Sequence, residues 1–271
     1  MNQSAERRAQ RAEVRRRVVF CALPSALCAL IFCALILAGS AAAQEVATAV
    51  VPVVGSVFGP TMIHWRTDVE IVNDTGFPTD VALELPCAPE QPVMLLTLGP
   101  GQSQRFTDII GQAFGLEQVL SPLRVTTAGR RSVSVRANAY AMRDDGSFFS
   151  TPQPLGVYVG PSFYPTRLLD GLAFSEEFRT NIGLVNFGAR DADFVLALQR
   201  IPGRTIAVSK MRVPAGGIIH TSIQSVFPLI TEGSGFSVIV ETAAPETHVY
   251  ASVIESATHS GRFVAPRIGV R

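Results

Sequence analysis

Two halves of this chain repeat one sequence pattern at a nearly constant distance. Residues 64–73 read HWRTDVEIVN, and residues 177–186, 113 positions later, read EFRTNIGLVN, with Arg, Thr, Val and Asn at the same places. Two shorter matches follow in the same order, each 115 positions apart: LGPG at 98–101 against VPAG at 213–216, and GSF at 146–148 against GRF at 261–263. Ordered matches of this kind indicate a tandem duplication, so the chain must form two copies of one fold.

The first 43 residues have the composition of an export signal. Six arginines precede an apolar run over residues 18–38, which ends in the small-residue stretch GSAAA at 39–43. This order is typical of a secretory signal peptide cleaved after Ala43. The apolar run is also long enough to span a bilayer, so an uncleaved membrane anchor is the alternative. We expect a secreted, periplasmic or cell-envelope protein that touches the membrane only if this segment is retained.

Cysteine and charge exclude several classes of protein. Only Cys87 lies beyond the signal segment, so no disulfide can form within residues 44–271. These residues carry 17 basic and 20 acidic side chains, a net charge of −3, and Lys210 is their one lysine. No basic run is present that could follow a phosphate backbone, so we expect no nucleic-acid partner.

The repeat divides the rest of the chain into two modules, predicted at residues 44–156 and 157–271. Apolar residues alternate with polar ones in 65–71 and again in 178–184, which is typical of a half-buried β-strand. This alternation predicts Trp65 and Phe178 at equivalent core positions. Gly and Pro turns at short intervals favour a sandwich or barrel of many short strands.

One segment of each copy breaks the strand pattern. Thr107 and Asp108 precede an apolar stripe that ends at Gly115, and Thr221 and Ser222 precede a shorter stripe that Pro228 interrupts. An N-cap, a stripe and a stop predict one short helix per copy. The fold class predicted is therefore all-β, as two tandem immunoglobulin-like β-sandwich modules that each carry one short helix.

A resemblance supports this architecture. The repeated phrase Arg-Thr-(Asp/Asn)-x-x-(Ile/Leu)-Val-Asn, followed by a strand, a turn, a capped helical segment and a Val-rich strand, resembles uncharacterised bacterial exported proteins with tandem immunoglobulin-like repeats. The resemblance covers both copies, and it implies an architecture and no activity.

The best-defined motif is interpreted as structural. A role kept in both copies suits a fold determinant better than a single active site. We expect the arginines to hold loop carbonyls through their five donors, and the asparagines to bond the backbone of turns. The residues of this structural repeat motif are Arg66, Thr67, Asn73, Arg179, Thr180 and Asn186.

No known arrangement of catalytic, metal or cofactor residues appears. The four histidines, His64, His220, His248 and His259, lack metal-ligand spacing, and the nucleophile and phosphate-loop motifs are missing. We therefore expect no enzyme, no metal and no cofactor.

Three functions remain open. The first is a non-enzymatic binding or structural protein of the cell envelope or extracellular space, with an unknown protein or glycan partner. The second is a carbohydrate-binding module with an exposed aromatic platform. The third is a hydrolase with a site at the module junction. Candidates for the platform are Phe148, Phe149, Tyr158, Phe163 and Tyr164.

Overall fold

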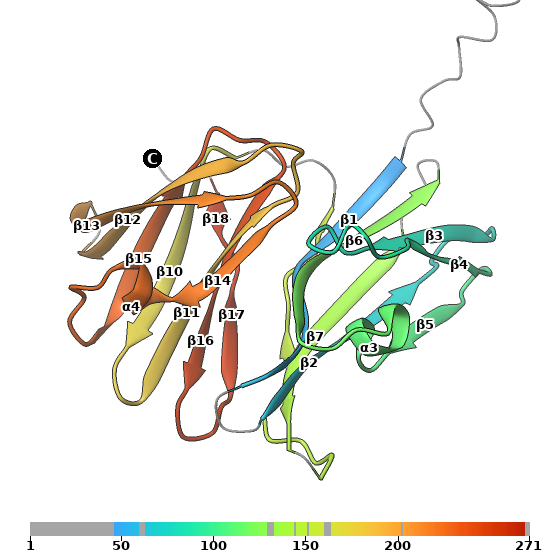
Figure 1. The fold of residues 1–271 in the computed structure, drawn as a ribbon, viewed down its shortest axis with the longest axis horizontal. Helices are drawn as coiled ribbons and strands as arrows, with labels where there is room; N and C mark the ends of the chain where they lie inside the picture. Colours follow the sequence, from blue (N-terminus) through green and yellow to red (C-terminus); the bar gives the residue numbers. More distant parts are fainter. Residues whose placement is uncertain are drawn as a thin grey trace, which may run out of the picture. The chain divides into compact units, whose positions relative to one another are not determined.

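Alternating apolar and polar residues form antiparallel strands in both halves of the chain (Figure 1). The computed structural model describes residues 46–59, 63–128, 133–143, 145–150, 152–159, 164–201 and 203–268. The predicted signal segment and Phe163 lie outside these residues. No helix in the described part of the chain has the length and apolar character needed to cross a membrane.

The first half forms one sheet that folds over a core. Its strand order is β4-β3-β6-β1-β2-β7-β8, with β5 paired to β2 and β9 paired to β1. The strands are β1 (Val46–Phe58), β2 (His64–Val72), β3 (Thr79–Glu84), β4 (Met94–Leu98), β5 (Ser103–Phe106), β6 (Val119–Ala128), β7 (Ser134–Met142), β8 (Gln153–Pro154) and β9 (Tyr158–Val159). β9 lies just past the predicted module boundary at residue 156 and still pairs with the first half, at Ala49 and Val50.

The second half forms two sheets. One has the order β13-β12-β15-β10-β18 and the other β14-β11-β16-β17. The strands are β10 (Thr166–Phe174), β11 (Phe178–Asn186), β12 (Ala192–Ile201), β13 (Arg204–Val213), β14 (Ile218–Ser222), β15 (Gly233–Glu241), β16 (Thr247–Glu255), β17 (Gly261–Val264) and β18 (Arg267–Ile268).

The two halves pair their strands in the same way. β3-β6-β1 corresponds to β12-β15-β10, and β5-β2-β7 corresponds to β14-β11-β16. The halves differ because the end of β1 also pairs with β2, at Ser56 and Arg66, which joins the two layers of the first half into one sheet. The order of elements is therefore duplicated along with the sequence.

Each half has its own apolar core. The first contains Val69, Ile71 and Leu83, and the second contains Ile182 and Phe194, all fully buried. The second core takes residues from both sheets, so it lies between them. Period-two alternation places these side chains on the inner faces of their strands.

Both predicted helices are present in the described residues. α3 (Ile109–Phe114) starts at Asp108, whose side chain accepts from the N–H of Gly111, and ends at Gly115 in the left-handed conformation with φ 66°. α4 (Ile223–Val226) starts at Ser222 and is one turn long. The prediction of an all-β chain with short capped helices is confirmed.

Candidate functional site

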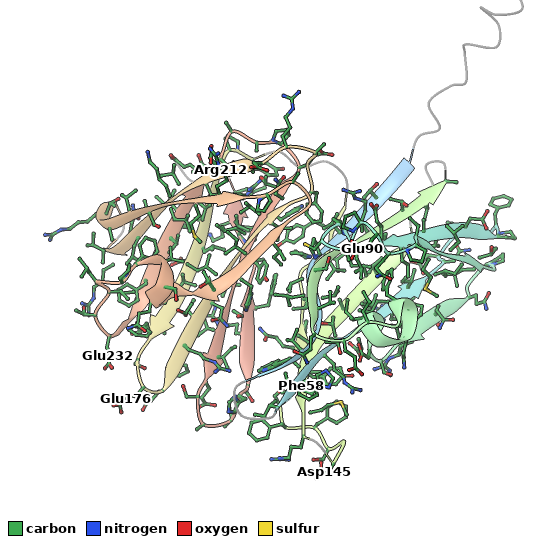
Figure 2. All side chains as sticks on the ribbon, viewed as in Figure 1. Phe58, Glu90, Asp145, Glu176, Arg212 and Glu232 are labelled. Carbon is green, nitrogen blue, oxygen red and sulfur yellow. The ribbon has the colours of Figure 1, made fainter. Side chains whose placement is uncertain are left out.

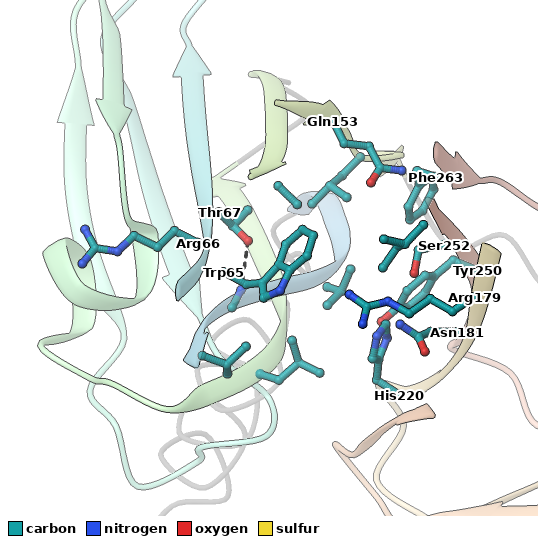
Figure 3. Close-up of a pocket in the computed structure, with 17 residues that line it drawn as sticks. Trp65, Arg66, Thr67, Gln153, Arg179, Asn181, His220, Tyr250, Ser252 and Phe263 are labelled. Carbon is teal, nitrogen blue, oxygen red and sulfur yellow. Dashed lines mark hydrogen bonds between the residues drawn. The ribbon is translucent and has the colours of Figure 1, made fainter. Parts of the chain in front are cut away.

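A pocket of about 270 Å³ lies where the first and second halves meet (Figure 3). Residues Glu45–Arg271 form one compact unit, and the pocket is part of it. Strands β1, β2, β6, β7 and β8 contribute side chains from the first half, and β11, β14, β16 and β17 from the second. Sequence reasoning named the junction as a place for a site, and it singled out the lining residues Arg66, Thr67 and Arg179 only as structural residues.

Arg179 is the charged side chain that points into this pocket (Figure 3). Its Nε–H is buried and has no hydrogen-bond partner among the described residues. One terminal nitrogen lies 3.5 Å from Nδ1 of His259. Burial lowers the pKa of the Arg179 guanidinium, and no ion pair in the described part of the chain involves it. The group thus keeps donors free for a bound molecule.

Tyr250 forms a fixed wall of the pocket. Its ring stacks on Phe263 with centroids 5.4 Å apart, and its hydroxyl lies 2.8 Å from Nδ1 of His220. Tyr250 is paired across the sheet with Gly183, where an added Cβ would lie 2.0 Å from the ring. Only glycine at 183 permits this position of the ring, and the resulting burial raises the pKa of Tyr250.

Trp65 lines the opposite side of the pocket, which corrects the sequence interpretation. It was predicted at a core position equivalent to that of Phe178 in the other copy, but it is only partly buried and belongs to neither core. Phe178 does pack against the second core. Trp65 lies on the same side of β2 as Thr67, but near the strand's first residue, where the second half covers it. Alternation predicts on which side of a strand a residue lies, but it does not predict which part of the protein packs against that side.

The two motif arginines also differ from the prediction that both hold backbone carbonyls. Arg66 is among the residues that line the pocket, but its guanidinium points away from it (Figure 3), and its Nε donates to Nδ1 of His64 at 3.2 Å. The same Nε lies 3.5 Å from a carboxylate oxygen of Asp108, the N-cap of α3. Arg179 faces the pocket instead. The prediction that these arginines hold loop carbonyls is therefore wrong for both. Among the described residues, Arg66 contacts the side chains of His64 and Asp108, and Arg179 faces the pocket.

Ser56, His64 and Asp108 resemble a catalytic triad but are bonded in the wrong order. The Ser56 hydroxyl contacts Nε2 of His64 at 2.9 Å and donates to Asp108 at 3.2 Å. Because Arg66 donates to Nδ1 of His64, the neutral ring carries its proton on Nε2 and donates to Ser56. A triad needs that nitrogen as the acceptor. Ser56 is also 1% exposed, so we interpret this group as a structural network around the N-cap.

The motif asparagines have the same surroundings in both copies. Asn73 donates from Nδ2 to the carbonyls of Phe77, Leu98 and Gly99 at 2.8, 2.9 and 3.0 Å. Asn186 donates from Nδ2 to the carbonyls of Arg190, Val213 and Pro214 at 2.7, 3.2 and 3.0 Å. Both residues are buried, and each ties two loops together.

The motif threonines join their strands to the preceding one. The Thr67 hydroxyl accepts from the N–H of Gly55 at 3.0 Å. The Thr180 hydroxyl accepts from the N–H of Ala173 at 3.2 Å and donates to the carbonyl of the same residue at 2.6 Å. Both hydroxyls therefore bond backbone groups of a neighbouring strand.

The remaining candidates are scattered. No group of three His, Cys, Asp or Glu that could hold a metal ion occurs in the described part of the chain. Cys87 donates to the carbonyl of Gly216 at 3.0 Å, and burial raises the pKa of its thiol. Of the proposed aromatic platform, Phe148 and Tyr164 are exposed, whereas Tyr158 packs against His248. Phe58 and Asp145, labelled among the side chains of Figure 2, are also exposed.

Comparisons with known proteins assign no family. No protein-family model matches the sequence, and no curated protein matches it. Among solved structures, the chain is similar to "Crystal Structure of Thermotoga maritima 1070", with 12% identity, 40% of this chain and 93% of that chain covered, and a TM-score of 0.33. A match to a Bacteroides uniformis β-glucuronidase 2 has 10% identity, 76% and 25% coverage, and a TM-score of 0.16. At these scores, neither likeness bears on the function of this mostly β-sheet protein.

Proposed function

We propose that this chain is an exported, non-catalytic binding protein built from two immunoglobulin-like β-sandwich modules, with its ligand site in the pocket where the copies meet. Two apolar cores and a matching strand order support the two modules. The charged, apolar and small-residue order of residues 1–43 supports export.

The observation that carries this proposal is the state of the pocket's polar groups. Four buried side-chain polar atoms lack a partner among the described residues, and two of them, Nε of Arg179 and Nε2 of Gln153, belong to the pocket lining. Buried polar groups in folded proteins are nearly always hydrogen-bonded. A purely structural junction would pair these groups, whereas a binding site leaves them for its ligand.

Turnover is not part of the proposal, because the pocket lacks a set of catalytic partners. Ser252 and His220 both line it, but no hydrogen bond joins them among the described residues, and no carboxylate occurs in the described lining. A serine nucleophile needs a base that a third group orients. The described lining contains no serine that is hydrogen-bonded to such a base.

The carbohydrate-binding alternative has weaker support. A glycan platform needs exposed aromatic faces that lie together. Phe148 is 62% exposed but packs edge-on against Tyr140, and Phe149 lies against Arg143 and His259. In the pocket Trp65 offers a further aromatic face, and the experiment below detects a glycan that binds to it.

Trp65 makes the proposal directly testable. It is the chain's single tryptophan, so intrinsic tryptophan fluorescence reports on the pocket alone. Purified residues 44–271 are titrated with a panel of small acids, amines, neutral aromatics and sugars. We expect at least one class to change the fluorescence, to raise Tm and to be recovered chemically unchanged.

A matched pair of variants locates the binding. Ser252→Leu fills the pocket, while Asn138→Leu makes a comparable change at the corresponding position of the first copy, outside the pocket lining. Binding that Ser252→Leu abolishes and Asn138→Leu retains supports the proposal. A panel without any pocket-dependent ligand, or recovery of a chemically altered ligand, overturns it.

A further inference from the structure

The first copy pairs every arginine of one sheet face with an acid. This face is the outer side of β2 and its neighbours β5 and β7, together with the start of α3. The pairs are Arg66 with Asp108 at 3.5 Å, Arg105 with Asp68 at 2.8 Å, and Arg136 with Glu70 at 3.6 Å. The face is therefore electrically balanced within its own copy.

The second copy lacks all three acids at the corresponding positions. Strand register aligns β11 with β2, β14 with β5 and β16 with β7. Where the first copy has Asp108, Asp68 and Glu70, the second has Ser222, Asn181 and Gly183. Where it has Arg105 and Arg136, the second has His220 and Tyr250. One arginine, Arg179, remains, and its counter-ion is gone.

In the second half, the corresponding face of β11, β14 and β16 lines the pocket. Arg179, Asn181, His220 and Tyr250 all line it, and no carboxylate occurs in the described lining. Arg179 is only partly buried, but its Nε–H is buried without a partner among the described residues, and an anion in the pocket would pair with it.

The unpaired atoms specify the kind of partner. The Nε of Arg179 and the Nε2 of Gln153 are both N–H donors. A ligand that satisfies both must bring acceptors. A guanidinium fork matches a carboxylate in a bidentate geometry, which adds direction to the charge attraction.

The rest of the lining indicates an apolar body. Val57, Trp65, Leu120, Ile254 and Phe263 supply aliphatic and aromatic surface. A volume of about 270 Å³ equals roughly nine water molecules at ~30 Å³ each, the size of a small organic molecule. Such a pocket has room for a small organic group with an apolar body.

We infer that the ligand is a small organic monoanion, whose carboxylate is held by Arg179 and whose flat apolar body lies against Trp65. This inference rests on the proposed binding function. It assigns Arg179 to ligand recognition and separates it from Arg66, its counterpart in the repeat.

Phenylacetate and phenylacetamide test the charge requirement. The two molecules have nearly the same shape, and only the first is an anion. We expect phenylacetate to quench or shift Trp65 fluorescence with an affinity roughly tenfold or more above that of the amide, since charge-assisted hydrogen bonds are about twice as strong as neutral ones. Benzoate, hexanoate and their amides extend the comparison to other body sizes.

Arg179→Met and Arg66→Met form the matched variants. Arg179→Met should remove the preference for the acid, while Arg66→Met should keep it, since that side chain points away from the pocket. Arg179→Lys should retain only part of the preference, because it keeps the charge and loses the fork. A structural role for Arg179 is tested without ligand: the Tm of Arg179→Met should equal or exceed that of the wild type.

The outcomes separate the two proposals. Neutral ligands that bind in the pocket with the same affinity in Arg179→Met as in the wild type overturn this inference and leave the binding function in place. No binding by any carboxylate at millimolar concentration, or a lower Tm for ligand-free Arg179→Met, also overturns the inference. The absence of any ligand sensitive to Ser252→Leu overturns the binding function itself.

Discussion

Arg66 and Arg179 hold the same position in the repeated motif, yet one guanidinium lies 3.5 Å from a carboxylate oxygen and the other has no ion pair among the described residues. Arg66 belongs to a network with His64 and Asp108, and Arg179 faces a pocket. The first copy therefore serves as a comparison for the second. It shows that the guanidinium at this position lies near a carboxylate when it does not point into the pocket.

Removing these two side chains should change stability in opposite directions. Arg179→Met eliminates a partly buried, unpaired charge, so the free energy of unfolding should rise by about 1 kcal/mol. Arg66→Met breaks a partly exposed network at a helix N-cap and should lower it by about 1 kcal/mol. Urea denaturation of both variants measures the difference, and a loss of stability in Arg179→Met would contradict the first expectation.

Asn73→Ala and Asn186→Ala should each lower the free energy of unfolding by about 3 kcal/mol. Each substitution leaves three loop carbonyls without their donor in a buried place. The two sites lie in separate halves of the chain and share no hydrogen-bond partner, so the double variant should show the sum. Asn181→Ala on β11 is the control, since its amide makes no hydrogen bond in the described part of the chain. Equal effects of all three substitutions would argue against the loop-tying role.

Gly183→Ala should lower the free energy of unfolding by about 3 kcal/mol, because the new methyl group would overlap the buried Tyr250 ring. It should also weaken any binding in the pocket, since the displaced ring forms one wall. Glu70→Ala, at the corresponding position of β2, is the matched control and should cost less than about 1 kcal/mol. Thermal unfolding of both variants measures this, and a Gly183→Ala protein as stable as Glu70→Ala would show that the ring can move freely.

Acid should destabilise the fold through His248. The ring is 8% exposed and packs against Tyr158 and Phe187. Burial, with a smaller effect of the Arg167 charge, lowers the pKa of His248 from 6.5 to about 4. The unfolded chain therefore binds this proton more readily, and stability should fall as the pH drops from 6.5 towards 4, by up to about 3 kcal/mol.

His248→Leu isolates this contribution. The variant keeps an apolar group of similar size at the position and cannot be protonated. We expect its stability to vary less with pH over the same interval, in urea titrations at matched ionic strength. Identical pH profiles for the variant and the wild type would assign the acid sensitivity to other groups.

The sequence alone determined the elements of this fold. The two-residue alternation of β2 and β11, the caps at Asp108 and Ser222, and the duplicated order of strands are local or repeated signals, so they can be read without knowing what packs where. The repeat also identified Asn73 and Asn186 as a pair, which the structure places in equivalent hydrogen-bond networks.

The candidate site was decided by tertiary structure. The pattern around Trp65 and Phe178 is nearly the same, and only the packing of the second half against the first places Trp65 in a pocket. The replacement of Asp68 by Asn181 and of Glu70 by Gly183 is visible in the repeat, but only the structure shows that these acids pair with Arg105 and Arg136 in the first copy. Strand alternation depends on neighbours in the chain, whereas a pocket depends on residues more than a hundred positions apart, which no local pattern connects.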